Sequence, residues 1–167
     1  LGLIVGSFLN VVILRLPKMM EQGWQRECCE VLDQPAPVQE PISLSHPGSH
    51  CPGCGAAIRP WQNIPVISWL VFRGRCARCG MGISVRYPAV ELITGVLSGL
   101  VAWHFGFGIE ALSGLALIWM LVALTGIDID TQLLPDSITL PLLWLGLAVN
   151  LFAVWTPLSS AVMGAML

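Results

Sequence analysis

Long apolar runs alternate with polar stretches along the chain and predict membrane-spanning helices. Apolar residues dominate positions 1–14, 88–105, 111–127 and about 137–155, and another apolar run starts at 160. A transmembrane helix needs about 20 mostly apolar residues. The three middle runs therefore predict spans, and the first predicts the last part of one.

The first run also carries residues that favour helix contacts. Gly2, Gly6 and Ser7 are small enough to allow close packing, and Asn10 is a candidate hydrogen-bond donor to a neighbouring helix. Pro17, a helix breaker, predicts that this helix ends there. A separate short helix is predicted at 20–32.

Composition and charge support a membrane protein. Hydrophobic residues make up 55% of the chain and charged residues 11%, against about 25% in soluble domains. All eight basic residues lie between positions 15 and 86. Positive charge beside spans marks the cytoplasmic side, so 15–87 is predicted to be a cytoplasmic domain. Counting spans forward places 128–136 on the same side. We expect a lipid bilayer as partner and no nucleic acid.

Two C-x2-C pairs lie in the polar domain and predict a metal site. They are Cys51 with Cys54, and Cys76 with Cys79. Four thiolates satisfy tetrahedral Zn²⁺ with no open position, which is the structural type of site. Disulfides or a redox pair are the alternatives. Zinc is favoured because the charge pattern places the domain in the reducing cytosol.

Other residues of the polar domain support this interpretation. Gly53 or Gly55, and Gly80, suit the turns of such a site because glycine accepts a positive φ. Cys28 and Cys29 form a vicinal pair that is not expected to bind the metal.

An acidic stretch between two apolar runs is the candidate for catalysis. It holds Asp128, Asp130 and Asp136, and no Lys or Arg follows Arg86 in the chain. A carboxylate at the edge of an apolar span is costly unless it is exposed to water, paired or used. A solvated loop with ordinary helix caps is the alternative interpretation.

Geometry limits the roles of these acids. Two positions along a helix separate Asp128 and Asp130 by about 200°, so they cannot act together on one substrate. Asp136 or Ser137 is predicted to cap the next helix. Glu91 lies one turn inside a span, where the helix dipole favours it and Arg86 is a candidate partner.

These motifs, in this order, resemble the bacterial prepilin peptidases. The matching segments cover nearly the whole chain: GSFLNVVILRLP (6–17), CPGCGAAIRPWQNIPVISWL (51–70), CARCG (76–80), RYPAVEL (86–92) and IDIDTQLLPD (127–136). The fold expected is an all-α polytopic membrane protein, a transmembrane helix bundle with a small cytoplasmic zinc-knuckle insertion.

The resemblance implies an aspartic peptidase of the GxGD type in the bacterial inner membrane. Such enzymes cleave the leaders of type IV prepilins and pseudopilins on the cytoplasmic side, and then methylate the new N-terminal amine with S-adenosylmethionine. It implies that Asp128 is the first catalytic aspartate, with Asp130 and Asp136 as possible supports. It also implies that Cys51, Cys54, Cys76 and Cys79 bind zinc.

The resemblance also leaves parts of the activity unassigned. The second catalytic aspartate of these enzymes lies in a G-x-G-D motif, which the chain lacks. Because the chain begins and ends inside apolar runs, we expect it to be a fragment that is cut at both ends. No glycine-rich loop identifies the S-adenosylmethionine site. A different class of function is a non-catalytic membrane anchor whose zinc domain binds a cytoplasmic partner. A third is a thiol redox protein.

Overall fold

The chain folds as a set of helices with an irregular, cysteine-containing segment inserted between the first and second long helices. The computed structural model describes residues 1–35, 37 and 40–166. Its helices in chain order are α1 (Gly2–Val31), the 3-10 helix η1 (Pro60–Asn63), α2 (Ile67–Val71), α3 (Arg86–Phe105), α4 (Ile109–Thr131), α5 (Asp136–Asn150) and α6 (Leu158–Met166). Residues 36, 38 and 39 of the predicted 15–87 domain, and residue 167, lie outside this description.

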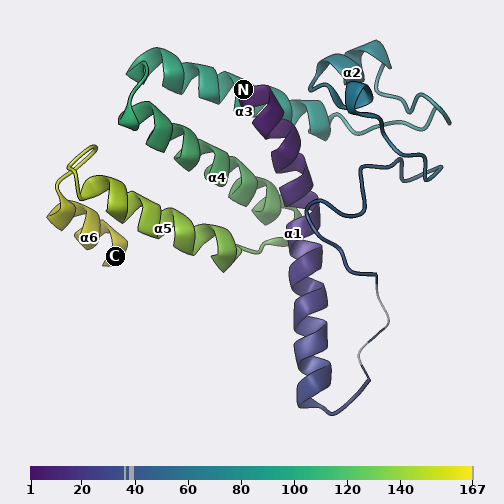
Figure 1. Cartoon of the computed structure of the whole chain (residues 1–167), viewed down its shortest axis with the longest axis horizontal. Coiled ribbons are helices and arrows are strands. Elements are labelled where there is room, and N and C mark those ends of the chain that lie inside the picture. Colours follow the sequence, from purple (N-terminus) through teal and green to yellow (C-terminus); the bar gives the residue numbers. More distant parts are fainter. Residues whose placement is uncertain (36, 38–39, 167) are drawn as a thin grey trace.

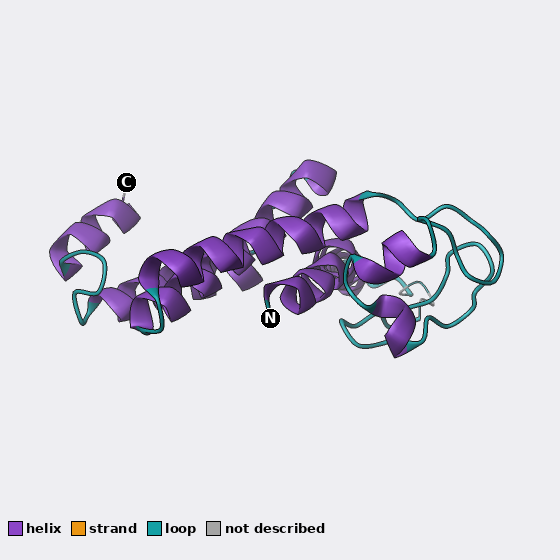
Figure 2. Cartoon of the chain, turned by 90° about the horizontal axis from the view of Figure 1, so that it is seen from above, coloured by secondary structure: helices purple, strands orange, loops and turns teal. Residues whose placement is uncertain are grey.

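The helices α3, α4 and α5 run side by side, and α1 crosses them at one end (Figures 1 and 2). The second half of α1 projects away from this bundle, and the segment with η1 and α2 lies beside the start of α3 (Figure 1). The start of α3 and the end of α4 therefore lie at the same end of the bundle as the cysteine segment.

Small residues let α1 approach α3 closely, as the sequence predicted. A Cβ added to Gly6 would lie 2.7 Å from the Glu91 Cα, and one added to Gly2 would lie 2.7 Å from the Ser98 Cβ. Asn10 donates a hydrogen bond of 3.0 Å to the Tyr87 carbonyl. Real Cβ atoms do not come so close, so the crossing depends on glycine at both positions.

The core lies where α1, α3 and α4 meet. Ile13 from α1, Thr94 from α3 and Ile127 from α4 are fully buried. Thr94 is polar, but its hydroxyl donates to the Val90 carbonyl at 2.7 Å, which satisfies it within its own helix.

The predicted break at Pro17 is wrong. The helix α1 continues through Pro17 to Val31, and it includes the region for which a separate helix at 20–32 was predicted. A proline removes one backbone hydrogen bond. Residues 18–31 contain many strong helix formers, including Lys, Met, Glu, Gln and Arg, which favour the helical backbone beyond it.

The bounds of α4 and α5 also differ from the predicted ones. The helix α4 runs beyond 111–127 at both ends, so Asp128 and Asp130 belong to its last turn and not to a loop. The helix α5 ends at Asn150 and not at 155. The Asn150 Oδ1 accepts hydrogen bonds from the backbone N–H groups of Trp155 and Thr156, both at 3.1 Å, and these bonds fix a turn.

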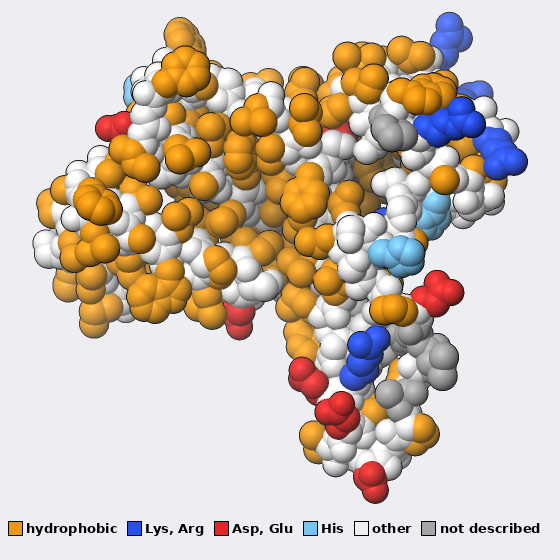
Figure 3. Space-filling model, viewed as in Figure 1, with side chains coloured by type: hydrophobic (Ala, Val, Ile, Leu, Met, Phe, Trp, Pro, Cys, Tyr) orange, Lys and Arg blue, Asp and Glu red, His pale blue; other side chains and the backbone are white. Residues whose placement is uncertain are grey.

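Among the residues that the structure describes, three helices are long and apolar enough to cross a membrane: α1, α3 and α4. The surface of the bundle is largely hydrophobic (Figure 3). Its exposed side chains include Trp103 and Trp144, at 85% and 66% exposure. Such a surface fits a lipid bilayer as its surroundings.

Candidate functional site

The four predicted cysteines come together in two turns of the same design. The Gly55 N–H donates to the Cys51 carbonyl, and the Gly80 N–H donates to the Cys76 carbonyl, both at 2.9 Å. Both glycines have positive φ, 66° and 72°, a conformation that glycine adopts without strain. An isolated antiparallel bridge flanks each turn. The expectation for Gly55 and Gly80 is confirmed.

Gly53 serves the site in another way. Its φ is not positive, but a Cβ there would overlap the Met81 Sδ. Met81 follows the second turn, so Gly53 allows the two turns to pack against each other.

The sulfur geometry fits a tetrahedral metal. The four Sγ atoms all lie within 4.8 Å of one another, and those of Cys51 and Cys79 are 3.7 Å apart. Zn–S bonds of about 2.3 Å in a tetrahedron place sulfurs roughly 3.8 Å apart. The cluster can therefore hold a metal ion, as predicted. Cys28 and Cys29 are not part of it, and none of the six cysteines is in a disulfide.

The thiols of the cluster differ in acidity. The backbone N–H groups of Cys79 and Arg78 stabilise the thiolate of Cys76 and lower its pKa to about 6. At Cys79 the backbone N–H of Met81 acts to lower the pKa, but desolvation and the neighbouring thiols of Cys54, Cys76 and Cys51 outweigh it and raise the pKa to about 11. One thiolate is thus available near neutral pH to start metal binding.

The acidic stretch runs from the last turn of α4 to the first turn of α5. Asp128 and Asp130 are in the last turn of α4, and Gln132 closes the helix in the left-handed conformation with its N–H on the Asp128 carbonyl at 2.8 Å. Asp128 is exposed.

Pro135, and not Asp136 or Ser137, occupies the cap position of α5, and no side chain caps that helix. Asp136 instead lies in the first turn of α5, where the helix dipole stabilises a negative charge.

Arg86 pairs with Asp130. It does not pair with Glu91, for which it was the candidate partner. Its guanidinium forms an ion pair with the Asp130 carboxylate and also donates to the Gly126 carbonyl at 3.1 Å. These contacts join the start of α3 to the end of α4. Among the described residues this is the only ion pair, so the Asp128 carboxylate has no cationic partner there.

Glu91 has a structural partner that the sequence did not reveal. It is only 7% exposed, and its Oε2 accepts a hydrogen bond of 2.7 Å from the Val66 N–H. Val66 has φ 61°, an unusual conformation for a β-branched residue. Glu91 therefore holds the turn before α2 against the membrane helices. Sequence spacing gave no signal for this contact, which joins residues 25 positions apart.

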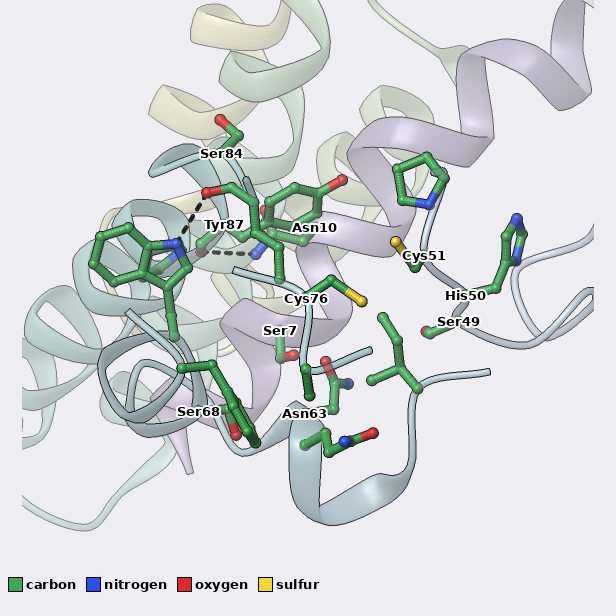
Figure 4. A pocket seen from close by; sticks show the side chains of 18 of the residues that line it. Ser7, Asn10, Ser49, His50, Cys51, Asn63, Ser68, Cys76, Ser84 and Tyr87 are labelled. Atoms are coloured by element: carbon green, nitrogen blue, oxygen red, sulfur yellow. Dashed lines mark hydrogen bonds between the residues drawn. The ribbon is translucent and has the colours of Figure 1, made fainter. Parts of the chain in front are cut away.

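A cavity of about 830 Å³ lies between the membrane helices and the cysteine segment. Its lining includes Ser7 and Asn10 from α1, Tyr87 from α3, Asn63 at the end of η1, and Cys51 and Cys76 from the two turns (Figure 4). Sequence reasoning did not predict this cavity, because its walls combine α1, the cysteine segment and the start of α3.

Comparisons with known proteins match both halves of the chain to peptidase families. Residues 1–105 match the bacterial peptidase A24 N-terminal domain, and residues 115–167 match the type IV leader peptidase family. No solved structure matches the chain.

Curated relatives named prepilin leader peptidase/N-methyltransferase align with almost the whole chain. The protein of Pseudomonas putida is 57% identical over 165 residues, which are 99% of this chain and 57% of the relative. That of Neisseria gonorrhoeae is 56% identical over 99% of this chain and 58% of the relative. That of Legionella pneumophila is 48% identical over 97% of this chain and 57% of the relative. The chain thus spans somewhat more than half the length of these relatives.

Proposed function

We propose that the protein of which this chain is part cleaves prepilins and pseudopilins and methylates the new N-terminus, because the chain belongs to the bacterial peptidase A24 N-terminal domain family and its residues 115–167 match the type IV leader peptidase family. The relatives' names carry both activities. The observation in the chain that supports cleavage is the contrast between two carboxylates of one helix turn. Arg86 neutralises Asp130, while Asp128 is exposed and free of cations among the described residues.

Asp128 is proposed as one of two catalytic aspartates. A pair of carboxylates hydrolyses an amide when one, ionised, takes a proton from water and the other, protonated, polarises the carbonyl. Two like charges at close range push their pKa values apart and create this division of roles. Arg86 holds Asp130 in an ion pair that joins the start of α3 to the end of α4, so Asp130 is suited to support the end of α4 instead.

The partner of Asp128 is proposed to be the aspartate of a G-x-G-D motif, which the chain does not contain. Asp136 lies in the first turn of α5, where the helix dipole stabilises its negative charge. The family resemblance implies a G-x-G-D motif for the second aspartate. Asp136 is therefore proposed as a support and not as the partner.

The four cysteines are proposed to hold a structural zinc ion. Their sulfur separations fit tetrahedral thiolate coordination. A closed four-thiolate site leaves no position for substrate, so the metal would stabilise the fold of the cysteine segment. S-adenosylmethionine is the proposed cofactor, and it supplies a methyl group on a positively charged sulfur.

The location proposed is the bacterial inner membrane, with the cysteine segment and Asp128 on the cytoplasmic side. All eight basic residues lie between 15 and 86 and none follows in the later apolar helices, and positive charge on one side of the spans marks the cytoplasmic side. The ion pair between Arg86 and Asp130 supports a shared face for the cysteine segment and the acidic stretch.

The test is a leader-cleavage assay on the full-length protein with Asp128→Asn. Zinc content and unfolding temperature serve as folding controls, and Asp33→Asn is the matched control because Asp33 is exposed and distant in sequence from the acidic stretch. We expect cleavage to fall at least a hundredfold in Asp128→Asn, since loss of one acid–base group costs about 10²–10⁴ in rate. Normal cleavage by a folded Asp128→Asn protein would remove Asp128 from the chemistry and favour the membrane-anchor function.

A further inference from the structure

The cavity between the membrane helices and the cysteine segment has the size and walls of a ligand site. Its volume of about 830 Å³ lies within the roughly 300–1,000 Å³ of small-molecule pockets. Its lining combines aromatic rings with charged groups of both signs. The structure therefore offers a place for a ligand with a flat ring and opposite charges.

Glu91 gives the cavity a buried negative charge. Its side chain lines the cavity and is 7% exposed. One oxygen accepts the Val66 N–H, and no cationic side chain among the described residues pairs with it. A buried carboxylate is costly without a positive partner. A cationic ligand would supply that partner.

Arginines give the cavity its positive charge, but most are already engaged. Arg75 and Arg78 flank Cys76 and offset the charge of −2 that four thiolates and a zinc ion would carry. Arg15 donates to the Ser43 and Leu44 carbonyls, at 3.0 and 3.4 Å. Arg59 is exposed and remains to bind a carboxylate, which its planar guanidinium suits.

Trp69 provides a fixed aromatic wall. Its Nε1 donates to the Ile83 carbonyl at 3.1 Å. Gly74 packs against the ring, since a Cβ at Gly74 would lie 2.7 Å from the Trp69 Cζ2. Phe72 and Tyr87 also line the cavity. Rings held in this way bind a flat heterocycle at little cost in entropy.

We propose that this cavity binds S-adenosylmethionine and that Glu91 faces the cationic part of the cofactor. This rests on the proposed methyltransferase function. The cofactor has an adenine ring, a positively charged sulfonium and amino group, and a carboxylate, and each has a matching group in the cavity. Because Cys51 and Cys76 line the same cavity, the zinc site would hold one of its walls.

The test is equilibrium dialysis of radiolabelled S-adenosylmethionine with the purified full-length protein and its variants. Glu91→Gln keeps the acceptor for Val66 and removes the charge. We expect it to bind about tenfold or more weakly, the usual effect of losing a charged hydrogen bond. Asn63→Trp, at an exposed position on the cavity wall, is expected to fill the cavity and abolish binding.

Two variants serve as controls. Glu110→Gln removes an exposed carboxylate from the start of α4, and Ser45→Trp adds the same bulk at an exposed position that does not line the cavity. Both are expected to bind like the wild type. Zinc content and unfolding temperature identify any variant that fails to fold.

The outcomes separate this proposal from the proposed function. Wild-type affinity in both Glu91→Gln and Asn63→Trp would overturn the cavity assignment and leave the methyltransferase standing. Absence of binding and of methylation in the wild type would overturn the methyltransferase itself.

The demethylated product S-adenosylhomocysteine, whose sulfur is neutral, tests the role of the charge. An equal loss of affinity for cofactor and product in Glu91→Gln would overturn a contact with the sulfonium. A preferential loss for the cofactor would support it. A cleaved pilin peptide could compete with the cofactor for the wild-type protein. If it does so while Asn63→Trp still binds the cofactor, the cavity would be assigned to the peptide instead.

Discussion

Arg86, at the start of α3, forms an ion pair with Asp130, in the last turn of α4. The same guanidinium donates to the Gly126 carbonyl, which lies where α1 crosses α4, since a Cβ on Gly126 would meet the Ile13 side chain at 2.5 Å. One side chain therefore ties together two helix ends beside Asp128.

Removing the ion pair between Arg86 and Asp130 is expected to lower the free energy of unfolding only moderately. The two side chains are 36% and 30% exposed, and such pairs contribute about 0.2–1 kcal/mol. Arg86→Gln and Asp130→Asn should each lower the free energy of unfolding in detergent micelles by about 1 kcal/mol, and their double-mutant cycle should show a coupling below that value. Arg26→Gln, at an exposed site on α1, is the control. Strict additivity of the two changes would mean that the pair contributes nothing.

Two glycines of α1 are expected to respond in opposite ways to the same substitution. Gly6→Ala places a methyl group 2.7 Å from the Glu91 Cα and should destabilise the protein by about 1–3 kcal/mol, as overpacking does. Gly23 has nothing within 4 Å of an added Cβ. Gly23→Ala should therefore stabilise the helix by about 0.5–1 kcal/mol. Thermal unfolding of both variants checks this, and equal effects would contradict the close crossing of α1 and α3.

Zinc content should depend on the clustered cysteines and not on the vicinal pair. Purified wild-type protein is expected to contain about one zinc ion per chain, the capacity of a four-thiolate site. Cys51→Ser should lose most of it, because Cys51 belongs to the cluster. Cys28→Ser should keep it, because Cys28 is exposed and outside the cluster. Metal analysis by mass spectrometry checks both, and loss of zinc in Cys28→Ser would contradict the assignment.

Acid is expected to release the metal. Zinc binds thiolates, so protons compete with it and affinity falls as the pH is lowered. In the metal-free cluster the pKa of Cys76 is about 6. Below that pH the Cys76 thiol is protonated as well, so the bound zinc should fall steeply as the pH is lowered further. Dialysis at a series of pH values followed by metal analysis measures this, and a constant zinc content across pH 6 would count against thiolate coordination.

The sequence predicted the parts of the structure that depend on local pattern. Apolar runs located α3 and α4, small residues predicted that α1 packs closely on another helix, and the two C-x2-C pairs located the sulfur cluster. Each of these signals lies within a few neighbouring positions, so periodicity and spacing were enough to find it.

The features that the sequence did not predict depend on contacts between distant segments. Glu91 had two plausible explanations along the chain, the helix dipole and Arg86, but its partner is Val66 on another segment. Arg86 is instead engaged 44 positions away, by Asp130. The break expected at Pro17 failed for a related reason, since a local rule about proline was outweighed by the helix formers that follow it.

We propose that cleavage and methylation use separate parts of the chain, and a crossed assay of two variants distinguishes them. Asp128→Asn and Glu91→Gln would each be measured for cleavage of a prepilin and for methylation of a pilin whose leader has already been removed. We expect Asp128→Asn to lose cleavage and keep methylation, and Glu91→Gln to keep cleavage and lose methylation. Loss of both reactions in both folded variants would contradict it, and would indicate a single shared site.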